Sequence, residues 1–186
     1  VRGADSTLYG TANKGKYGIN GIVFKVQPDG SGFTVLKSFT NSVEGANPYA
    51  GVTLSGDVLY GTTEYGGSWG WGTVFKVRTD GTGYTVLMNF SRSEGGIPRG
   101  DLISSSNVLY GTTSGGGNSA KGTVFRVNTD GTDFTVLKHF SGNDGQLPSA
   151  GLTLSGGVLY GTTREGGDSG RGTAFKINTD STDFTV

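Results

Sequence analysis

The sequence predicts an all-β fold: a β-propeller of four roughly 50-residue, four-stranded blades, or a four-blade segment of a larger repeat protein. The phrase Leu-Tyr-Gly-Thr begins at residues 8, 59, 109 and 159, so its copies are separated by 51, 50 and 50 residues. A period near 50 is typical of repeat arrays, in which each unit buries its apolar face against the next. Short β-like runs fill each period, and no window shows the 3.6-residue apolar spacing of a helix.

The third repeat shows the expected strands most clearly, at residues 100–104, 108–113, 122–127 and 134–140. Each run is rich in β-branched and aromatic residues and is bounded by Gly, Asn, Asp, Ser or Pro, which favours strands separated by turns. Asp-Gly links the third and fourth runs at residues 29–30, 80–81 and 130–131, and this pair is a strong hairpin signal. The last copy reads Asp180-Ser181, so we expect that turn to be strained or differently shaped.

The whole chain, residues 1–186, is expected to form one repeat domain with blades at about 1–47, 48–97, 98–147 and 148–186. In a propeller the first strand of a blade lines the channel and the fourth lies outside. Val1 aligns with the end of an inner strand, and Val186 falls inside an outer strand. The chain fits either a four-bladed ring or an excised segment, and the segment is slightly favoured because neither end has a polar cap. Other copies of the chain could also cover the open ends.

Composition excludes several classes of partner and chemistry. The 15 Lys and Arg residues balance 15 Asp and Glu residues, with no basic stripe, which disfavours nucleic acid or an anionic membrane as partner. No apolar run approaches 18 residues, so we expect no membrane span. The absence of Cys excludes a disulfide framework, thiolate metal sites and a Cys nucleophile.

The repeat unit itself resembles a known family. It reads Leu-Tyr-Gly-Thr-Thr, then Gly-Gly, then a Gly-Thr-Val-Phe-Lys-Val-Asn-Thr-Asp-Gly-Thr stretch, and is similar to the GloVer (Gloeobacter/Verrucomicrobia-type) tandem repeat of exported bacterial proteins. The resemblance implies a propeller-like fold and an extracellular or cell-surface location, and it assigns no activity to any residue. The first copy departs from it, with Ala12 and Ile22 in place of Thr. Its clearest carriers are Tyr110, Gly111, Gly122, Phe125, Asp130, Gly131 and Phe140.

One segment looks like a catalytic motif. Gly167-Asp168-Ser169-Gly170 is similar to the nucleophile motif of trypsin-like proteases. A Ser nucleophile needs a base, and the only His of the chain, His139, falls on an expected outer strand. The motif also occupies a loop that every repeat contains, so we interpret it as a repeat position and expect no catalytic centre.

Three carboxylates recur with a 50-residue period: Glu44, Glu94 and Asp144, each just before a Gly and four residues before a Pro. A ring of such side chains near the channel mouth could bind a hard cation such as Ca²⁺ through oxygen ligands. The alternative is a turn acid that forms local hydrogen bonds. We expect no other cofactor. The same three acids are also the only ones that could serve a polysaccharide-active enzyme.

Tyr65, Trp69 and Trp71 gather in one loop of the second repeat, where the repeats differ most. Exposed aromatic side chains on a Gly-rich loop can stack on sugars or anchor a protein partner. Alternatively, the two Trp side chains pack on a neighbouring blade or chain.

Taken together, the sequence favours a non-catalytic extracellular β-propeller repeat module at the cell surface, either structural or binding a protein or glycan. One alternative is a self-assembling subunit of a fibre or sheath, because a head-to-tail contact that does not close generates a filament. A less favoured alternative is a polysaccharide-active enzyme.

Overall fold

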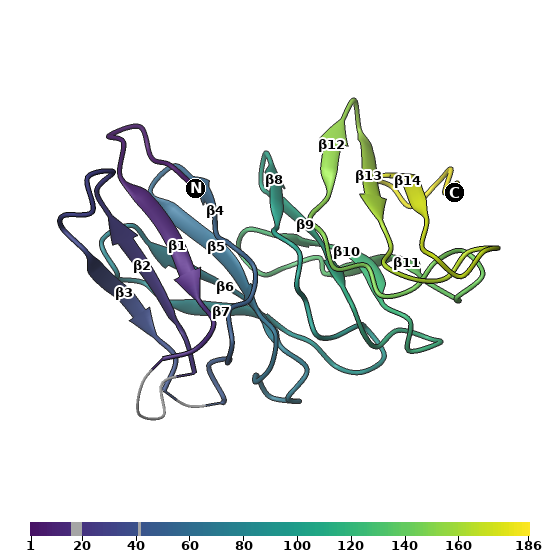
Figure 1. Cartoon of the computed structure of the whole chain (residues 1–186), viewed down its shortest axis with the longest axis horizontal. Helices are drawn as coiled ribbons and strands as arrows, with labels where there is room; N and C mark the ends of the chain where they lie inside the picture. The colour runs from purple at the N-terminus through teal and green to yellow at the C-terminus, as the bar shows by residue number, and fades with distance from the viewer. Residues whose placement is uncertain (16–19, 41) are drawn as a thin grey trace.

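The computed structural model describes residues 1–15, 20–40 and 42–186 (Figure 1). In this part of the chain there are fourteen strands and no helix, which confirms the predicted all-β class. The strands form four antiparallel sheets, one for each repeat, and every strand pairs with its neighbour in sequence. Each repeat therefore folds as one local sheet.

The two middle sheets have four strands each, and the first and last have three. In the first sheet an isolated bridge between Arg2 and Leu8 holds the place of the inner strand, and in the last a bridge between Lys176 and Thr185 holds that of the outer strand. The first two sheets comprise β1 (Leu8–Ala12), β2 (Ile22–Val26) and β3 (Thr34–Ser38), then β4 (Thr53–Ser55), β5 (Val58–Thr63), β6 (Thr73–Arg78) and β7 (Thr85–Asn89). The other two comprise β8 (Ile103–Ser105), β9 (Val108–Thr113), β10 (Thr123–Asn128) and β11 (Thr135–His139), then β12 (Thr153–Ser155), β13 (Val158–Thr162) and β14 (Ala174–Asn178).

The inner strand of the third sheet is shorter than predicted, because the residues just before it form hydrogen bonds with a segment of the preceding repeat instead of with their own sheet. We expected a strand at residues 100–104, whereas β8 begins at Ile103. The Asp101 carboxylate accepts a hydrogen bond from the Gly51 N–H at 2.7 Å, and the Leu102 carbonyl accepts one from the Thr53 hydroxyl at 2.5 Å. These bonds tie the segment to the preceding sheet.

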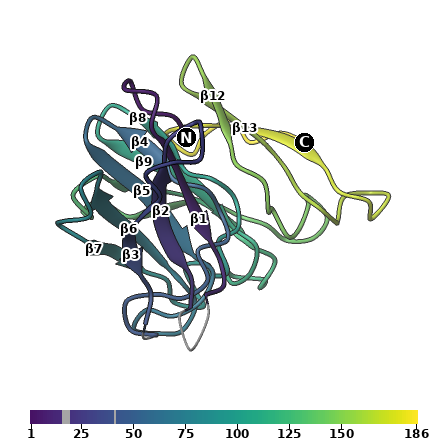
Figure 2. The ribbon, with the colours of Figure 1, turned by 60° about the vertical axis from the view of Figure 1, so that its left-hand side comes forward.

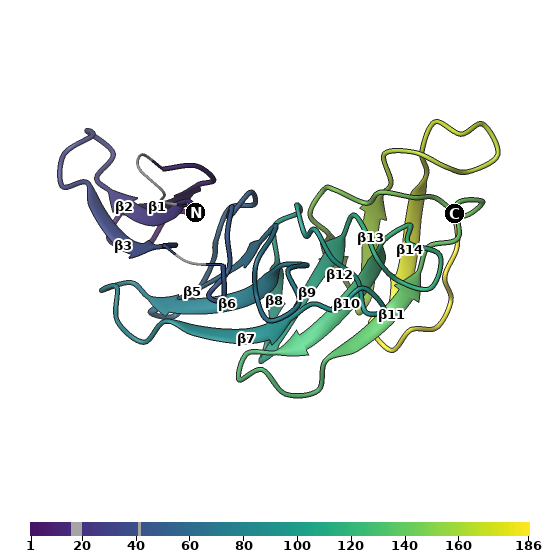
Figure 3. The ribbon, with the colours of Figure 1, turned by 90° about the horizontal axis from the view of Figure 1, so that it is seen from below.

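The four sheets follow one another along an arc (Figure 3). In the first three sheets the outer strands β3, β7 and β11 lie toward its convex side. The sheets β1–β3 and β12–β14 form opposite ends of the arc, and the β12–β13 hairpin rises away from the other sheets (Figure 2). The arrangement is that of consecutive propeller blades.

The core lies between consecutive sheets rather than within them. Three apolar clusters join the first sheet to the second, the second to the third and the third to the fourth. At each of these interfaces three aromatic rings pack with centroids 5.1–6.1 Å apart, mostly edge to face. The ring triads are Phe39–Phe75–Tyr84, Phe90–Phe125–Phe134 and Phe140–Phe175–Phe184.

The Leu-Tyr-Gly-Thr phrase encodes these interfaces. Leu109 and Tyr110 are both buried, Leu109 in the cluster with the preceding sheet and Tyr110 in the cluster with the following one. Gly111 pairs with Phe125 across β9 and β10, and the phenyl ring lies over the glycine. A Cβ on Gly111 would lie 2.7 Å from Phe125 Cζ, so only glycine admits the ring there.

A pair of buried Thr hydroxyls joins the second and third strands at their ends. Thr113 and Thr123 are register partners, and their hydroxyl oxygens lie 2.8 Å apart. The second and fourth sheets contain the same pair at the same distance. In the first sheet Ala12 and Ile22 are the register partners at this place. The two departures from the repeat noted in the sequence therefore replace both members of one Thr pair.

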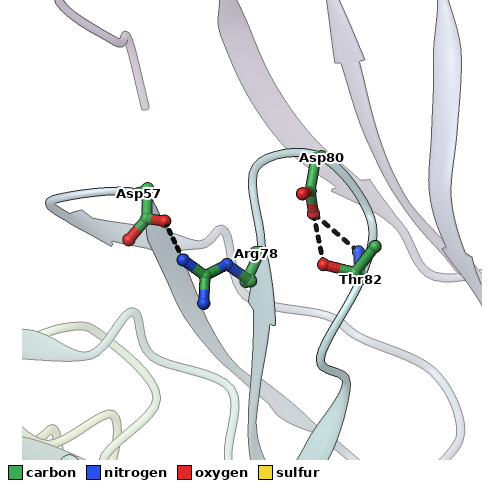
Figure 4. Close-up of polar contacts among 4 residues, drawn as sticks. All are labelled: Asp57, Arg78, Asp80 and Thr82. Carbon is green, nitrogen blue, oxygen red and sulfur yellow. Dashed lines mark hydrogen bonds and ion pairs between the residues drawn. The ribbon is translucent and has the colours of Figure 1, made fainter.

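The Asp-Gly turns are closed by the aspartate itself. Asp80 accepts hydrogen bonds from the Thr82 backbone N–H at 2.8 Å and from its hydroxyl at 2.7 Å, beside an Asp57–Arg78 ion pair on the surface (Figure 4). The Thr82 side chain and backbone lower the pKa of Asp80 in consequence. Ser181 adopts φ 75° and keeps the hydrogen bonds of the other turns. That turn is strained, as expected, but the alternative of a different shape is wrong.

Candidate functional site

The loop between β5 and β6 presents Trp69 and Tyr65 to solvent, with 68% and 42% of their surface exposed. Glycines with positive φ shape this loop; a Cβ on Gly66 would lie 2.4 Å from the Ser42 carbonyl oxygen. The loop is also tied to β7, because Asn89 Oδ1 accepts a hydrogen bond from the Ser68 N–H at 2.9 Å. Trp69 is therefore held out on a well-anchored turn.

Trp71 takes the structural role that the sequence left open. Its side chain is half-buried and packs against the cluster between the second and third sheets. The indole lies over Gly96, where a Cβ would come within 2.6 Å of Trp71 Cε3, and the Trp71 carbonyl accepts a hydrogen bond from the Ile97 N–H. Of the three predicted ligand-binding residues, Tyr65 and Trp69 remain exposed to a ligand.

Sequence reasoning missed the side chains that surround Tyr65. Arg99 donates from Nε and Nη2 to Glu64 Oε1 at 2.8 and 2.6 Å, and Glu64 is only 6% exposed. The hydrogen bond to Glu64 raises the pKa of Arg99, and Tyr65 contributes to the same shift. The guanidinium carbon lies 5.8 Å from the centroid of the exposed Tyr49 ring. We call Tyr49, Glu64, Tyr65 and Arg99 the tyrosine–arginine cluster.

Three loops bring this cluster together: the connection before β4, the loop between β5 and β6, and the connection before β8. Ala46 and Tyr65 exchange two backbone hydrogen bonds, at 2.8 and 3.0 Å, so the segment before β4 runs beside the end of β5. Its chain continues through Pro48 to Tyr49, while Arg99 follows the corresponding proline one repeat later. Ser149 stands at the same position in the fourth repeat. The signal that could have found Tyr49 and Arg99 is therefore variation at a fixed repeat position.

This arrangement suits recognition of a polar ligand with flat apolar faces. The two exposed tyrosine rings offer stacking surfaces, and the planar guanidinium of Arg99 lies 5.8 Å from the centroid of the Tyr49 ring. The buried carboxylate of Glu64 fixes the orientation of Arg99, because a buried acid needs a charged hydrogen-bond donor. Trp69, on the same loop as Tyr65, extends the aromatic surface.

The three predicted metal ligands are not brought together. No group of three His, Asp or Glu residues with metal-binding geometry occurs in residues 1–15, 20–40 and 42–186. Glu44 pairs with Lys37 at 2.8 Å, and Asp144 pairs with Lys138 at 2.6 Å. Glu94 accepts hydrogen bonds from the backbone N–H and the hydroxyl of Ser91. Each acid serves its own loop.

His139 is a hydrogen-bond acceptor for a loop and lies beside Lys138. Its Nδ1 accepts from the Asn118 N–H at 3.3 Å, the interaction that Asn89 makes with Ser68 one repeat earlier. Burial lowers the pKa of His139, and the charge of Lys138 lowers it further. His139 therefore has a structural contact, the hydrogen bond from Asn118 to Nδ1. Ser169, of the protease-like segment, lies exposed on a loop of the fourth repeat.

A second open surface lies beside the same loop of the third repeat. A cavity of about 710 Å³ is lined by Arg92, Ser93 and residues 117–120. Ser119 stands there at the position that Trp69 occupies in the second repeat. The loops that vary between repeats therefore surround both candidate binding surfaces.

The arc of consecutive three- and four-stranded antiparallel sheets, one for each repeat, defines a β-propeller repeat protein. The chain belongs to the Gloeobacter/Verrucomicrobia repeat family, whose model matches residues 1–186. This confirms the resemblance drawn from the repeat unit.

Similar solved structures share the fold at low sequence identity. A chain in the crystal structure of a nidogen/laminin complex matches with a TM-score of 0.69 and 18% identity, covering 97% of this chain and 60% of that one. A protein from Agrobacterium tumefaciens assigned as TolB matches with a TM-score of 0.64 and 13% identity, covering 99% of this chain and 62% of that one. The chain thus spans about three fifths of each.

The sequence matches none of the curated proteins compared with it. No helix in the described residues has the length and apolar character needed to cross a bilayer.

Proposed function

We propose that this protein is a non-catalytic β-propeller repeat module that binds a glycan or protein outside the cell or at its surface. The observation that carries the proposal is the exposed aromatic surface of Tyr49, Tyr65 and Trp69 beside the Glu64–Arg99 pair. These residues differ from their counterparts in the other repeats, whereas the interface residues recur. Loops on a rigid scaffold are where recognition commonly resides.

Two further points support the proposal. The nidogen/laminin structure is that of a complex, so a protein of this fold binds another protein there. The family resemblance implies export, which agrees with a partner at the cell surface. The non-catalytic part rests on Glu44, Glu94 and Asp144, the candidate acids of a polysaccharide-active enzyme, which lie in separate loops and serve local contacts.

Binding can be tested with the chain's own fluorescence, because Trp69 is exposed and Trp71 is half-buried. We would titrate soluble bacterial polysaccharides and a cell-surface protein fraction, and measure binding by emission shift and by co-sedimentation. The variant Trp69→Ala with Tyr65→Ala should lose binding while its unfolding midpoint stays near that of the wild type. Ser169→Ala, at the exposed Trp69 position of the fourth repeat, is the matched control.

The proposal fails if the double variant binds every probe as the wild type does, or if the wild type binds none. Release of reducing sugar or unsaturated product from any polysaccharide would overturn its non-catalytic part. Trp71→Ala should instead lower the unfolding midpoint, because it removes a packed side chain.

A further inference from the structure

The ion pair between Glu64 and Arg99 belongs to one junction only, that of the second and third repeats. Glu64 is 6% exposed and accepts hydrogen bonds from Arg99 Nε and Nη2 at 2.8 and 2.6 Å. At the junction of the third and fourth repeats, Ser114 and Ser149 stand at these two positions. The Ser114 hydroxyl donates there to the Pro148 carbonyl at 2.9 Å. The fold therefore closes the same junction without charges.

Stability gives little reason for the charged version. Both charges lose hydration when a pair is buried, so a buried ion pair stabilises a fold little more than neutral groups of similar size do. A buried acid and an arginine that occur at one junction, where another junction has two serines, point to a function for the pair.

Arg99 keeps hydrogen-bond donors for a ligand. Glu64 takes two of the five N–H groups of the guanidinium, which leaves three for other acceptors. The Arg99 side chain is 35% exposed, and its guanidinium carbon lies 5.8 Å from the centroid of the Tyr49 ring. Tyr49 is itself 57% exposed. A flat apolar ring and a fixed set of donors therefore lie side by side at the surface.

The charges around the cluster oppose an acidic ligand. Glu64 offsets the charge of Arg99. Asp101 is exposed, and its carboxylate accepts a hydrogen bond from the Gly51 N–H at 2.7 Å. Gly51 lies two residues after Tyr49, so Asp101 brings a second carboxylate to the edge of the cluster. Two carboxylates beside one guanidinium disfavour a negatively charged ligand, because like charges brought together repel.

We propose that the tyrosine–arginine cluster binds a neutral glycan, whose sugar rings stack on Tyr49 and Tyr65 and whose hydroxyl oxygens accept hydrogen bonds from Arg99. A pyranose has an apolar C–H face and a hydroxyl edge, which match an aromatic ring beside a guanidinium. Glu64 is a positioning residue: it orients the guanidinium and cancels its charge. The inference rests on the proposed function and names the ligand class of that site.

A protein partner fits the cluster less well. The centres of protein interfaces are depleted in Glu and Asp, whereas this cluster is built around Glu64 and has Asp101 at its edge. Hydroxyl groups, in contrast, can accept from a guanidinium and donate to a carboxylate without a change of charge.

Calorimetric titration of the intact chain tests the ligand class. The neutral probes are soluble dextran and mannan, the acidic probes are alginate and polygalacturonate, and a cell-surface protein fraction is the third arm. At about 150 mM salt, where long-range charge effects are screened, at least one neutral probe should bind. Both acidic probes should bind at least about tenfold more weakly.

Two variants test the ion pair. Glu64→Gln keeps an acceptor for Arg99 but removes the offsetting charge, so the affinity for acidic relative to neutral probes should rise at least about tenfold, a change that a purely structural role would not produce. The double variant Glu64→Ser with Arg99→Ser takes the two residues that the next junction already uses. It should bind neutral probes at least about tenfold more weakly while its unfolding midpoint stays near that of the wild type.

The matched control is Asp57→Ser with Arg78→Ser. It removes another acid–arginine pair, at the opposite end of β5 and β6, and should leave binding unchanged. Neutral probes that bind the double Ser variant as they bind the wild type would overturn the inference, as would an unaltered charge preference in Glu64→Gln.

The results also separate this inference from the proposed function. If only an acidic probe or the protein fraction binds, and Trp69→Ala with Tyr65→Ala abolishes that binding, the neutral glycan is wrong and the proposed function stands. If no probe of any arm binds the wild type, both fail.

Discussion

Replacing Gly111 by Ala isolates the role of the glycine in the repeated phrase. Gly111 lies within β9 and does not adopt a positive φ, so Ala fits the backbone. Its Cβ would lie 2.7 Å from Phe125 Cζ and 2.8 Å from Leu102 Cδ2, well inside the 3.5–4.0 Å at which carbon atoms pack. Both neighbours are buried and cannot move aside. Overpacking costs about 1–3 kcal/mol, and the higher strand propensity of Ala returns about 0.5–1 kcal/mol.

We therefore expect Gly111→Ala to lower the free energy of unfolding by about 1–2 kcal/mol. For a chain of this size that corresponds to a fall in melting temperature of about 2–8 °C, measured by calorimetry. Gly10→Ala is the matched control: its Cβ would lie 2.9 Å from Phe24 Cζ, but Phe24 is at the end of the arc and half-exposed, so its ring can turn away. An equal loss in both variants would refute the argument, because it would show that the backbone, not the ring, requires glycine.

Three further substitutions test local features. Ser181→Gly should raise the free energy of unfolding by about 1 kcal/mol, because Ser181 holds φ 75° where the other turns have Gly. Thr113→Val should cost about 1 kcal/mol in urea unfolding, because it removes one of the two partners of the Thr123 hydroxyl, the other being the Glu94 carbonyl. Pairing Thr113→Ala with Thr123→Ile, as in the first repeat, should recover most of that loss. The pKa of His139 is lowered below its usual 6.5 in the folded chain, so the unfolded chain binds the proton more readily. The free energy of unfolding should therefore decline as pH falls below about 6.5. His139→Asn should remove that decline.

Each of these has a contrary result that would count against it. An unchanged melting temperature in Ser181→Gly would mean that the turn carries no strain. A double Thr variant less stable than Thr113→Val would mean that the two hydroxyls do not act as a pair. A wild type whose stability does not change between pH 7 and 5, relative to His139→Asn, would remove the structural role given to the neutral imidazole.

Most of the fold could be predicted because the residues that pack between sheets recur at the same positions in every repeat. Tyr110, Gly111 and Phe125 recur at fixed spacing, and the structure shows why: the Tyr faces one neighbouring sheet, and the Phe ring covers the Gly. The boundaries of the strands were harder to predict from the sequence. The inner strand was misplaced because residues 100–102 look like a strand by composition, while their hydrogen bonds reach the preceding sheet.

The candidate site could be predicted only in part, for a physical reason. Tyr65, Trp69 and Trp71 stand out by residue type. Nothing in the local sequence indicates that the Trp71 indole packs over Gly96, whereas the Trp69 side chain stays exposed to solvent. Arg99 meets Glu64 across 35 residues, a contact that only the packing of sheets creates. The repeat period shows which positions correspond between repeats, but it does not show which side chains contact one another.

Variation between repeats does not by itself mark a binding residue, and the structure shows how to separate the two cases. Lys37 and Lys138 lie over the rings of Tyr84 and Phe184, at 4.3 and 4.2 Å from their centroids, and pair with Glu44 and Asp144. Met88 stands at the same position in the second repeat and packs into the apolar cluster instead. Both choices fill the same space between sheets, so this variation is structural. Tyr49, Arg99 and Ser149 also vary at one position, yet Tyr49 remains 57% exposed, with its ring open to solvent. Variable positions that stay exposed are therefore the ones at which a ligand should be sought.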